Sequence, residues 1–135
     1  YVCRREQFNA AHRLAVPGWT EEQNRAVFGE CASPNYHGHN FVLYVTVRGE
    51  VDPETGMLMN IKDLSQLIKE QVVRKVDHGN LNVDVAFMEG LTPTTENLAR
   101  QIWQQLAPHL TGGGTELYSI RLYETENHYV DYYGT

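Results

Sequence analysis

The segment HGHNFVLYVTV, residues 37–47, alternates between two kinds of side chain and predicts a β-strand that continues to Glu50. In a strand, every second side chain points to the same face of the sheet. One face of this strand therefore carries two histidines followed by an apolar row, namely His37, His39, Phe41, Leu43, Val45 and Val47. The strand both begins a hydrophobic core and presents two imidazoles at one end of it.

An earlier segment, residues 5–15, also alternates and predicts a second strand. His12 lies on the same face of this strand as Phe8 and Ala10, so a third imidazole could reach His37 and His39. Three imidazoles with an open fourth position are typical of catalytic zinc. From the residues alone, the alternative of three histidines without metal, at the surface or satisfied in the core, remains open.

The rest of the chain predicts two helices and two further strands. VDPETG, residues 51–56, is a turn, and Asn60 can cap a helix with apolar residues at helical spacing through Val76. The second helix begins at Thr92-Pro93, with Thr94 as the other candidate cap, and its apolar residues continue to Leu110. Strands are predicted over 115–125 and 128–133, and long loops over 16–36 and 77–91.

The predicted order β-β-α-α-β-β indicates an α+β fold, an antiparallel sheet with two helices on one face. The second face of the sheet is expected to carry Val42, Tyr44, Tyr118, Ile120 and Leu122. Because that face is not uniformly polar, we expect another subunit to cover it, which predicts an oligomer.

Composition limits the classes of protein and partner. The length of 135 residues predicts a single domain, residues 1–135, and the start at Tyr1 suggests that an initiator Met is missing. A net charge of −6 without a basic cluster argues against nucleic-acid binding, and no apolar run suits a membrane span. The two cysteines have no CxxC spacing, which predicts a reducing, cytoplasmic location.

Four further side chains are candidates for chemistry. Cys31 precedes the histidines in CASPNYHGHN and is either an inert buried thiol or a proton-transfer group, since a nearby metal favours the thiolate. Asp77-His78 is either an acid–base pair or an ordinary helix end. Glu124 lies on a partly apolar strand face, so it needs a partner, either an arginine or a ligand with paired N–H donors. We interpret His109 and His128 as surface residues.

Six motifs resemble the 6-pyruvoyl-tetrahydropterin synthase family, in order along nearly the whole chain: FNAAHRL, C-x5-HGHN, GEVDPETGMLMN, VDHGNLN, PTTEN and RLYETEN. The resemblance implies the tunnelling fold, β2α2β2, and hexamers of two stacked trimers with active sites between subunits. It implies zinc binding by His12, His37 and His39. It also implies proton transfer by Cys31, Asp77 and His78, and a pterin anchored by Glu124 in a pocket lined by Thr94, Thr95 and Glu96.

The implied reaction is a lyase reaction assisted by Mg²⁺, in which 7,8-dihydroneopterin triphosphate loses triphosphate and becomes 6-pyruvoyl-tetrahydropterin. The main alternative is a 6-carboxy-tetrahydropterin synthase of the queuosine route, for which a shorter C-x3-HGH spacing is typical. A subgroup that makes a hydroxymethyl-pterin uses a glutamate near the position of Glu30, but the presence of Cys31 argues against it. A non-catalytic zinc-binding module would need none of Cys31, Asp77, His78 and Glu124.

Overall fold

The computed structural model describes every residue from Tyr1 to Thr135. Its main layer is a five-stranded sheet with the strand order β3-β1-β2-β4-β5. Neighbouring strands are antiparallel except β3, which runs parallel to β1. The strands are β1 (Val2–His12), β2 (His37–Gly49), β3 (Gly79–Asn80), β4 (Thr115–Thr125) and β5 (His128–Tyr132).

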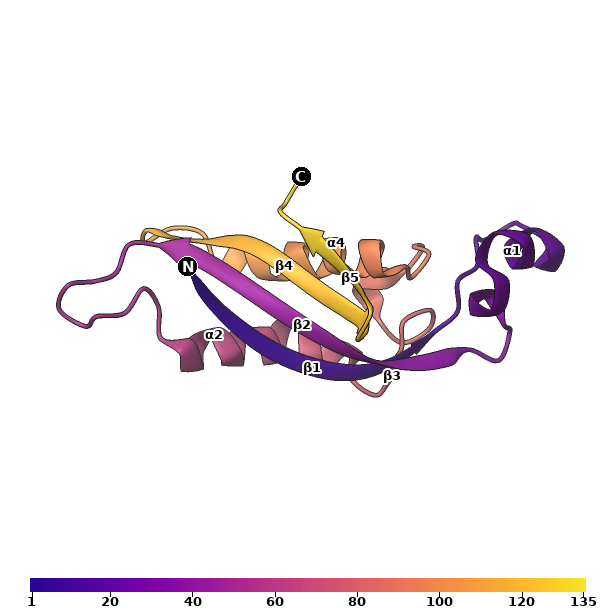
Figure 1. Cartoon of the computed structure of the whole chain (residues 1–135), viewed down its shortest axis with the longest axis horizontal. Coiled ribbons are helices and arrows are strands. Elements are labelled where there is room, and N and C mark those ends of the chain that lie inside the picture. Colours follow the sequence, from indigo (N-terminus) through magenta and orange to yellow (C-terminus); the bar gives the residue numbers. More distant parts are fainter.

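Two long helical segments lie on the same side of the sheet, whereas a short helix lies beyond one end of it (Figure 1). The long segments are α2 (Ile61–Ile68), which continues through the π-turn η2 (Lys69–Val73) into α3 (Arg74–Val76), and α4 (Thr95–Leu106). The short helix α1 (Glu21–Phe28) is followed by the 3₁₀ turn η1 (Gly29–Ala32); η3 (Ala86–Met88) and η4 (Ala107–His109) are further 3₁₀ turns. None of the helices has the length and apolar character required to cross a membrane.

The helix from Ile61 to Val76 forms where it is predicted, and its cap and its π-turn have clear causes. The Asn60 side chain accepts a hydrogen bond from the Lys62 N–H at 2.9 Å, which satisfies one free donor of the first turn. Fully buried apolar residues recur every four positions, at Leu64, Ile68, Val72 and Val76. In a regular α-helix this spacing would drift by about 40° at each step, and the wider π-turn offsets that drift.

The core lies between the sheet and these helices. Phe8 and Phe41 are opposite one another in the β1–β2 register, and their rings stack with centroids 5.1 Å apart. Leu43 and Val45 continue the row along β2, and both are fully buried. Strands β1, β2, β4 and β5 and the two long helical segments confirm the predicted α+β class and the placement of both helices on one face.

Several predicted boundaries are wrong. The first strand spans Val2–His12 rather than 5–15, and the predicted loop 16–36 contains α1 and η1. Thr94, not Thr92-Pro93, begins α4, because the Thr94 side chain accepts from the Asn97 N–H at 3.1 Å. The α-helix ends at Leu106 and passes into the 3₁₀ turn η4, which contains a proline.

A bulge in β4 changes which residues face the core. The register with β2 shifts between Thr46 and Val47, and Tyr118 is the extra residue on β4. Ile120 and Leu122 are therefore fully buried in the core, so their predicted place on the open face is wrong. Tyr118 does lie among the half-buried residues, in contact with Tyr1 at a ring-centroid distance of 4.8 Å.

Candidate metal centre and substrate pocket

Three imidazoles meet where β1 ends and β2 begins. His12 is directly opposite His37 in the β1–β2 register, and His39 follows on the same face of β2. The ring centroids are 4.6 Å apart for His12 and His37, 5.1 Å for His12 and His39, and 4.8 Å for His37 and His39. Together with Glu124 these residues offer four ligand atoms that all lie within 4.8 Å of one another. The predicted histidine cluster is therefore formed within one chain.

Hydrogen bonding leaves the nitrogen atoms of this cluster free to bind a metal. His12 is fully buried, and its Nδ1 lies 2.8 Å from the Pro93 carbonyl oxygen. Because a carbonyl only accepts, Nδ1 carries the proton and Nε2 keeps its lone pair. The Nε2 atoms of His12, His37 and His39 are all buried without a hydrogen-bond partner. Such convergent unpaired nitrogens are costly unless a cation binds them, so the donor set fits a metal ion.

The electrostatics of the cluster also favour metal binding. Burial is the main cause that lowers the pKa of His37 below its ordinary value, and His12 and His39 lower it further. Burial likewise lowers the pKa of His39, although the Glu124 carboxylate acts in the opposite direction. Rings that stay neutral at neutral pH offer lone pairs rather than protons, which is the form a metal requires.

Glu124 reaches the cluster from β4. Its Oε1 lies 3.3 Å from His12 Nε2 and 3.2 Å from His39 Nε2. Contact with the His12 ring lowers the pKa of Glu124, and burial opposes this effect. The predicted alternative of an arginine partner is wrong, because the neighbouring Arg121 binds Asp131 through two hydrogen bonds of 2.7 and 2.9 Å.

A pocket of about 490 Å³ opens beside Glu124, a volume within the range of small-molecule sites. Its lining residues come from the start of α4 and from the β4–β5 hairpin: Thr95, Glu96, Glu124, Asn127, His128, Tyr129 and Val130. Three of the four predicted pocket residues are thus brought together. Thr94 is not among them, because its side chain caps α4.

The residues of the β4–β5 hairpin that line the pocket were missed in the sequence. His128 is exposed, as predicted for a surface residue, but it begins β5 instead of lying in a turn, and it lines the pocket. The available signal was the short gap after the RLYETEN motif, since a tight hairpin must return the chain directly past Glu124.

Cys31 lies in η1, outside the group of four ligand atoms. Its carbonyl oxygen accepts a hydrogen bond from the Leu14 N–H at 2.7 Å, two residues beyond His12. The Cys31 turn is therefore held at the same end of the sheet as the histidines. The thiol is free and half-buried.

Asp77 and His78 lie at the outer edge of the sheet, beside β1. Asp77 Oδ2 is 2.9 Å from His78 Nδ1, and Asp77 Oδ1 accepts from the Asn9 N–H at 2.8 Å. The Asn9 hydrogen bond is the main cause that lowers the pKa of Asp77. The His78 N–H donates to the Asn9 carbonyl at 2.6 Å, while the His78 side chain is 87% exposed. Two strands, β1 and β2, separate this pair from β4 and Glu124.

Fold and site together define an α+β protein with a three-histidine and carboxylate centre at the end of its sheet, next to a small-molecule pocket. Comparison with known proteins gives the family. Residues 1–135 match the family described as 6-pyruvoyl tetrahydropterin synthase. The chain belongs to this family.

Individual relatives agree with this assignment. The chain is 44% identical over 133 residues to the 6-pyruvoyl tetrahydrobiopterin synthase of Homo sapiens, covering 98% of this chain and 90% of the relative. Identity to the same-named protein of Dictyostelium discoideum is also 44% over 133 residues, covering 98% and 95%. The solved Caenorhabditis elegans 6-pyruvoyl tetrahydropterin synthase superimposes with a TM-score of 0.92 at 35% identity, covering 99% of this chain and 94% of that one. This likeness confirms the α+β tunnelling fold.

Proposed function

We propose that this protein converts 7,8-dihydroneopterin triphosphate into 6-pyruvoyl-tetrahydropterin with loss of triphosphate. The observation that carries the proposal is the convergence of three buried, unpaired Nε2 atoms with Glu124 at the wall of the pocket. The names of the relatives supply the product class, and the chain offers a side chain for each role that the reaction needs.

The proposed metal is zinc, held by His12, His37 and His39, because three imidazoles with an open position suit it. When bound, zinc acts as a Lewis acid that polarises substrate oxygens and so eases removal of neighbouring protons. The Pro93 carbonyl fixes the tautomer of His12, as partners of metal-binding histidines commonly do. Mg²⁺ is proposed as a further requirement, with the triphosphate oxygens as its ligands.

Glu124 is proposed to anchor the pterin ring. A carboxylate accepts two parallel hydrogen bonds, which matches a ring N–H beside an exocyclic amine. Glu124 lies between the imidazoles and the pocket, so a pterin bound to it would place its side chain near the metal. Thr95 and Glu96 line the same pocket and are proposed to contact the ring.

Cys31 is proposed as the base that removes one proton, and the Asp77–His78 pair as the group that moves another. The Asp77 carboxylate orients the His78 ring through Nδ1, leaving Nε2 on a side chain that is mostly exposed. Because this pair lies at the outer edge of the sheet, it is proposed to serve the pocket of a neighbouring subunit in a hexamer of two stacked trimers. A cytoplasmic location and a single domain are proposed with this role.

The second candidate is a 6-carboxy-tetrahydropterin synthase, which would use the same centre but cleave the side chain. The five-residue spacing between Cys31 and His37, together with the names of the relatives, favours the pyruvoyl product. A non-catalytic zinc module is disfavoured because the centre adjoins a pocket that a storage site would not need.

The test is incubation of zinc-loaded protein with 7,8-dihydroneopterin triphosphate and Mg²⁺, followed by mass spectrometry of the pterin. Release of triphosphate with a pyruvoyl-pterin mass is expected. A carboxy-pterin with acetaldehyde would establish the second candidate, and a hydroxymethyl-pterin would point to Glu30. Chelator-treated protein is the matched control, and full activity without metal would contradict the proposed role of zinc.

A further inference from the structure

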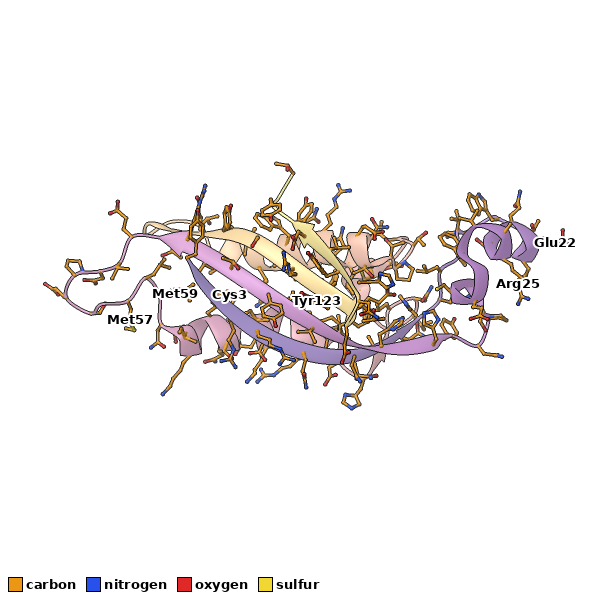
Figure 2. All side chains as sticks on the ribbon, viewed as in Figure 1. Cys3, Glu22, Arg25, Met57, Met59 and Tyr123 are labelled. Atoms are coloured by element: carbon orange, nitrogen blue, oxygen red, sulfur yellow. The ribbon has the colours of Figure 1, made fainter.

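The turn that carries Cys31 is attached to the rest of the molecule by few contacts. Residues 17–36 extend beyond the end of the sheet, away from α2 and α4, and Figure 2 shows Glu22 and Arg25 at that extreme (Figures 1 and 2). Helix α1 packs chiefly against η1. The position of the thiol therefore depends on the few bonds that join this segment to the chain just after β1.

Three of these bonds come from residues 13–16. The Leu14 N–H donates to the Cys31 carbonyl at 2.7 Å, and the Val16 N–H donates to the buried Asn24 side chain at 2.8 Å. The third comes from a side chain: Arg13 Nη2 donates to the Ala32 carbonyl at 2.9 Å. The peptide groups on both sides of Ala32 Cα are thus tied to the residues that follow His12.

Arg13 is itself firmly held. Asn82 Oδ1 accepts from the Arg13 N–H at 2.8 Å, and Asn82 Nδ2 donates to the Arg13 carbonyl at 3.0 Å. Asn82 is fixed in turn, because its own N–H donates to the Asn80 side chain at 2.9 Å. Asn82 therefore takes the place of a neighbouring strand and continues the pairing of β1 and β3 by one residue.

The guanidinium of Arg13 is in an unusual environment for a cation. Its side chain is only 18% exposed, and its Nε is buried without a hydrogen-bond partner. Its ionic contact, to Glu21 at 3.5 Å, is with a carboxylate that is 73% exposed and so contributes little. A half-buried arginine whose Nε–H is unpaired contributes little to stability, so its use lies in where it places its Nη2 donor.

We propose that Arg13 is a positioning residue for Cys31. Its guanidinium holds the carbonyl of the residue after Cys31, and its backbone is clamped by Asn82, so the thiol-bearing turn is fixed to the metal-bearing end of β1. The proposal rests on the proposed function for the role of Cys31 as a base. The restraint on the turn itself can be measured without any substrate.

The first experiment measures alkylation of Cys31 by iodoacetamide in zinc-loaded protein without substrate. A Cys3→Ser background is used, because Cys3 is the other free thiol and is exposed. Arg13→Gln is expected to alkylate about tenfold faster, since a hydrogen bond from a charged group holds a segment by about that factor. Arg13→Lys, which keeps the positive charge and a donor group on a long side chain, is expected to fall between Arg13→Gln and the parent. Arg100→Gln, on the exposed face of α4, is the control and should match the parent.

Zinc content and far-ultraviolet circular dichroism are measured on the same samples. If Arg13→Gln fails to fold, Arg13→Lys and hydrogen exchange of the Leu14 N–H provide the test, with faster exchange expected. Alkylation and exchange equal to the parent in folded, zinc-loaded protein would overturn the proposal.

The second experiment separates positioning from substrate contact. We expect Arg13→Gln to lower kcat about tenfold or more with KM within about twofold, because a displaced base affects turnover more than binding. A raised KM with unchanged alkylation would make Arg13 a phosphate contact and overturn the positioning role. If the parent protein forms no pyruvoyl-pterin, the proposed function fails, but the alkylation result still decides whether Arg13 restrains Cys31.

Discussion

The core-facing row of β2 has two halves that differ in chemistry but share one strand and one face. From Phe41 to Val47 the row is apolar, fully buried and covered by the helices, whereas His37 and His39 continue it into the candidate metal centre. The apolar half makes its contacts within the fold. The polar half buries Nε2 atoms that the fold leaves unpaired.

The difference shows how one strand, held in place by its apolar half, can position polar groups that have no hydrogen-bond partner within the fold. Burial of each large apolar side chain contributes about 1.5–3 kcal/mol, whereas an unsatisfied buried polar group costs about 1–3 kcal/mol. The apolar half also pairs in register with β1, and the same register places His12 opposite His37. Substitutions in the apolar half should therefore mainly lower stability, whereas substitutions in the polar half should mainly affect metal binding and activity.

The largest effect is expected for a residue outside both halves, Cys31. Cys31→Ala should lower turnover by about 10²–10⁴-fold, the usual cost of losing a general base. Zinc content should stay at the parental level, because the thiol is not among the four clustered ligand atoms. Single-turnover kinetics and metal analysis on the same preparation provide the check. Joint loss of zinc and activity would instead make Cys31 a ligand.

Leu43→Ala tests the apolar half. The side chain is fully buried, so its truncation should lower the free energy of unfolding by about 2–5 kcal/mol. Val42→Ala, one residue away on the open face, is the matched control and should cost clearly less. Urea unfolding of chelator-treated protein measures both. The comparison fails if the two variants lose equal stability, or if folded Leu43→Ala protein no longer binds zinc.

The sequence predicted the two long helices and the histidine face well, because both rest on strong periodicity. Val76 and Leu64 fall on one helical stripe, and the alternation around His12 leaves a single face for its ring. Sequence reasoning missed α1, although Thr20 and Gln23 form a capping box, because the helix buries only Asn24 and has no apolar stripe. Helical periodicity cannot reveal a helix that packs so little.

The strand faces near Glu124 could not be predicted, since they depend on a bulge. Tyr118 adds one residue to β4 opposite β2, and an alternation rule without that residue places Ile120 and Leu122 on the wrong face. The contact of Glu124 with His12 and His39 likewise depends on β4 pairing beside β2, a long-range choice that local pattern does not specify. Bulges and strand order are set by long-range tertiary structure and not by local sequence pattern.

His39→Ala tests the polar half directly. Loss of one of three imidazoles should weaken zinc binding by at least about a hundredfold, since removing even a partner of a ligand costs about 10–100-fold. The unfolding free energy of metal-free protein should change little or rise, because an unpaired buried nitrogen is removed. Competition with a chromophoric chelator gives the affinity. His109→Ala, at an exposed helix end, should bind zinc like the parent.

Glu124→Gln tests the junction between metal centre and pocket. An amide presents one N–H where the carboxylate offered an acceptor, so a pterin donor would meet another donor. Pterin affinity should fall by about ten- to a hundredfold, the range of one charge-assisted hydrogen bond, with zinc retained. Glu124→Ala, which adds no donor, should lose less. Calorimetric titration with sepiapterin decides the matter, and unchanged affinity in both variants would place the pterin anchor elsewhere.

The smallest effect is expected in the pH dependence of the metal-free fold, and it separates the two halves most cleanly. Burial lowers the pKa values of His37 and His39 below 6.5 in the folded protein. At a pH between 6.5 and these lowered pKa values, the unfolded chain therefore binds protons that the folded chain does not. Stability should therefore fall as pH decreases from 6.5 through the lowered pKa values. The lowered pKa of Glu124 changes stability in the same direction but acts only below its ordinary value of 4.5.

Urea midpoints of chelator-treated protein at pH 7.5, 6.5 and 5.5 measure the trend. His39→Gln should flatten it and Leu43→Ala should shift the whole curve down without flattening it, because only the polar half titrates in this range. A parental midpoint that is constant or rises towards pH 5.5 would show that the imidazoles are not held neutral by burial.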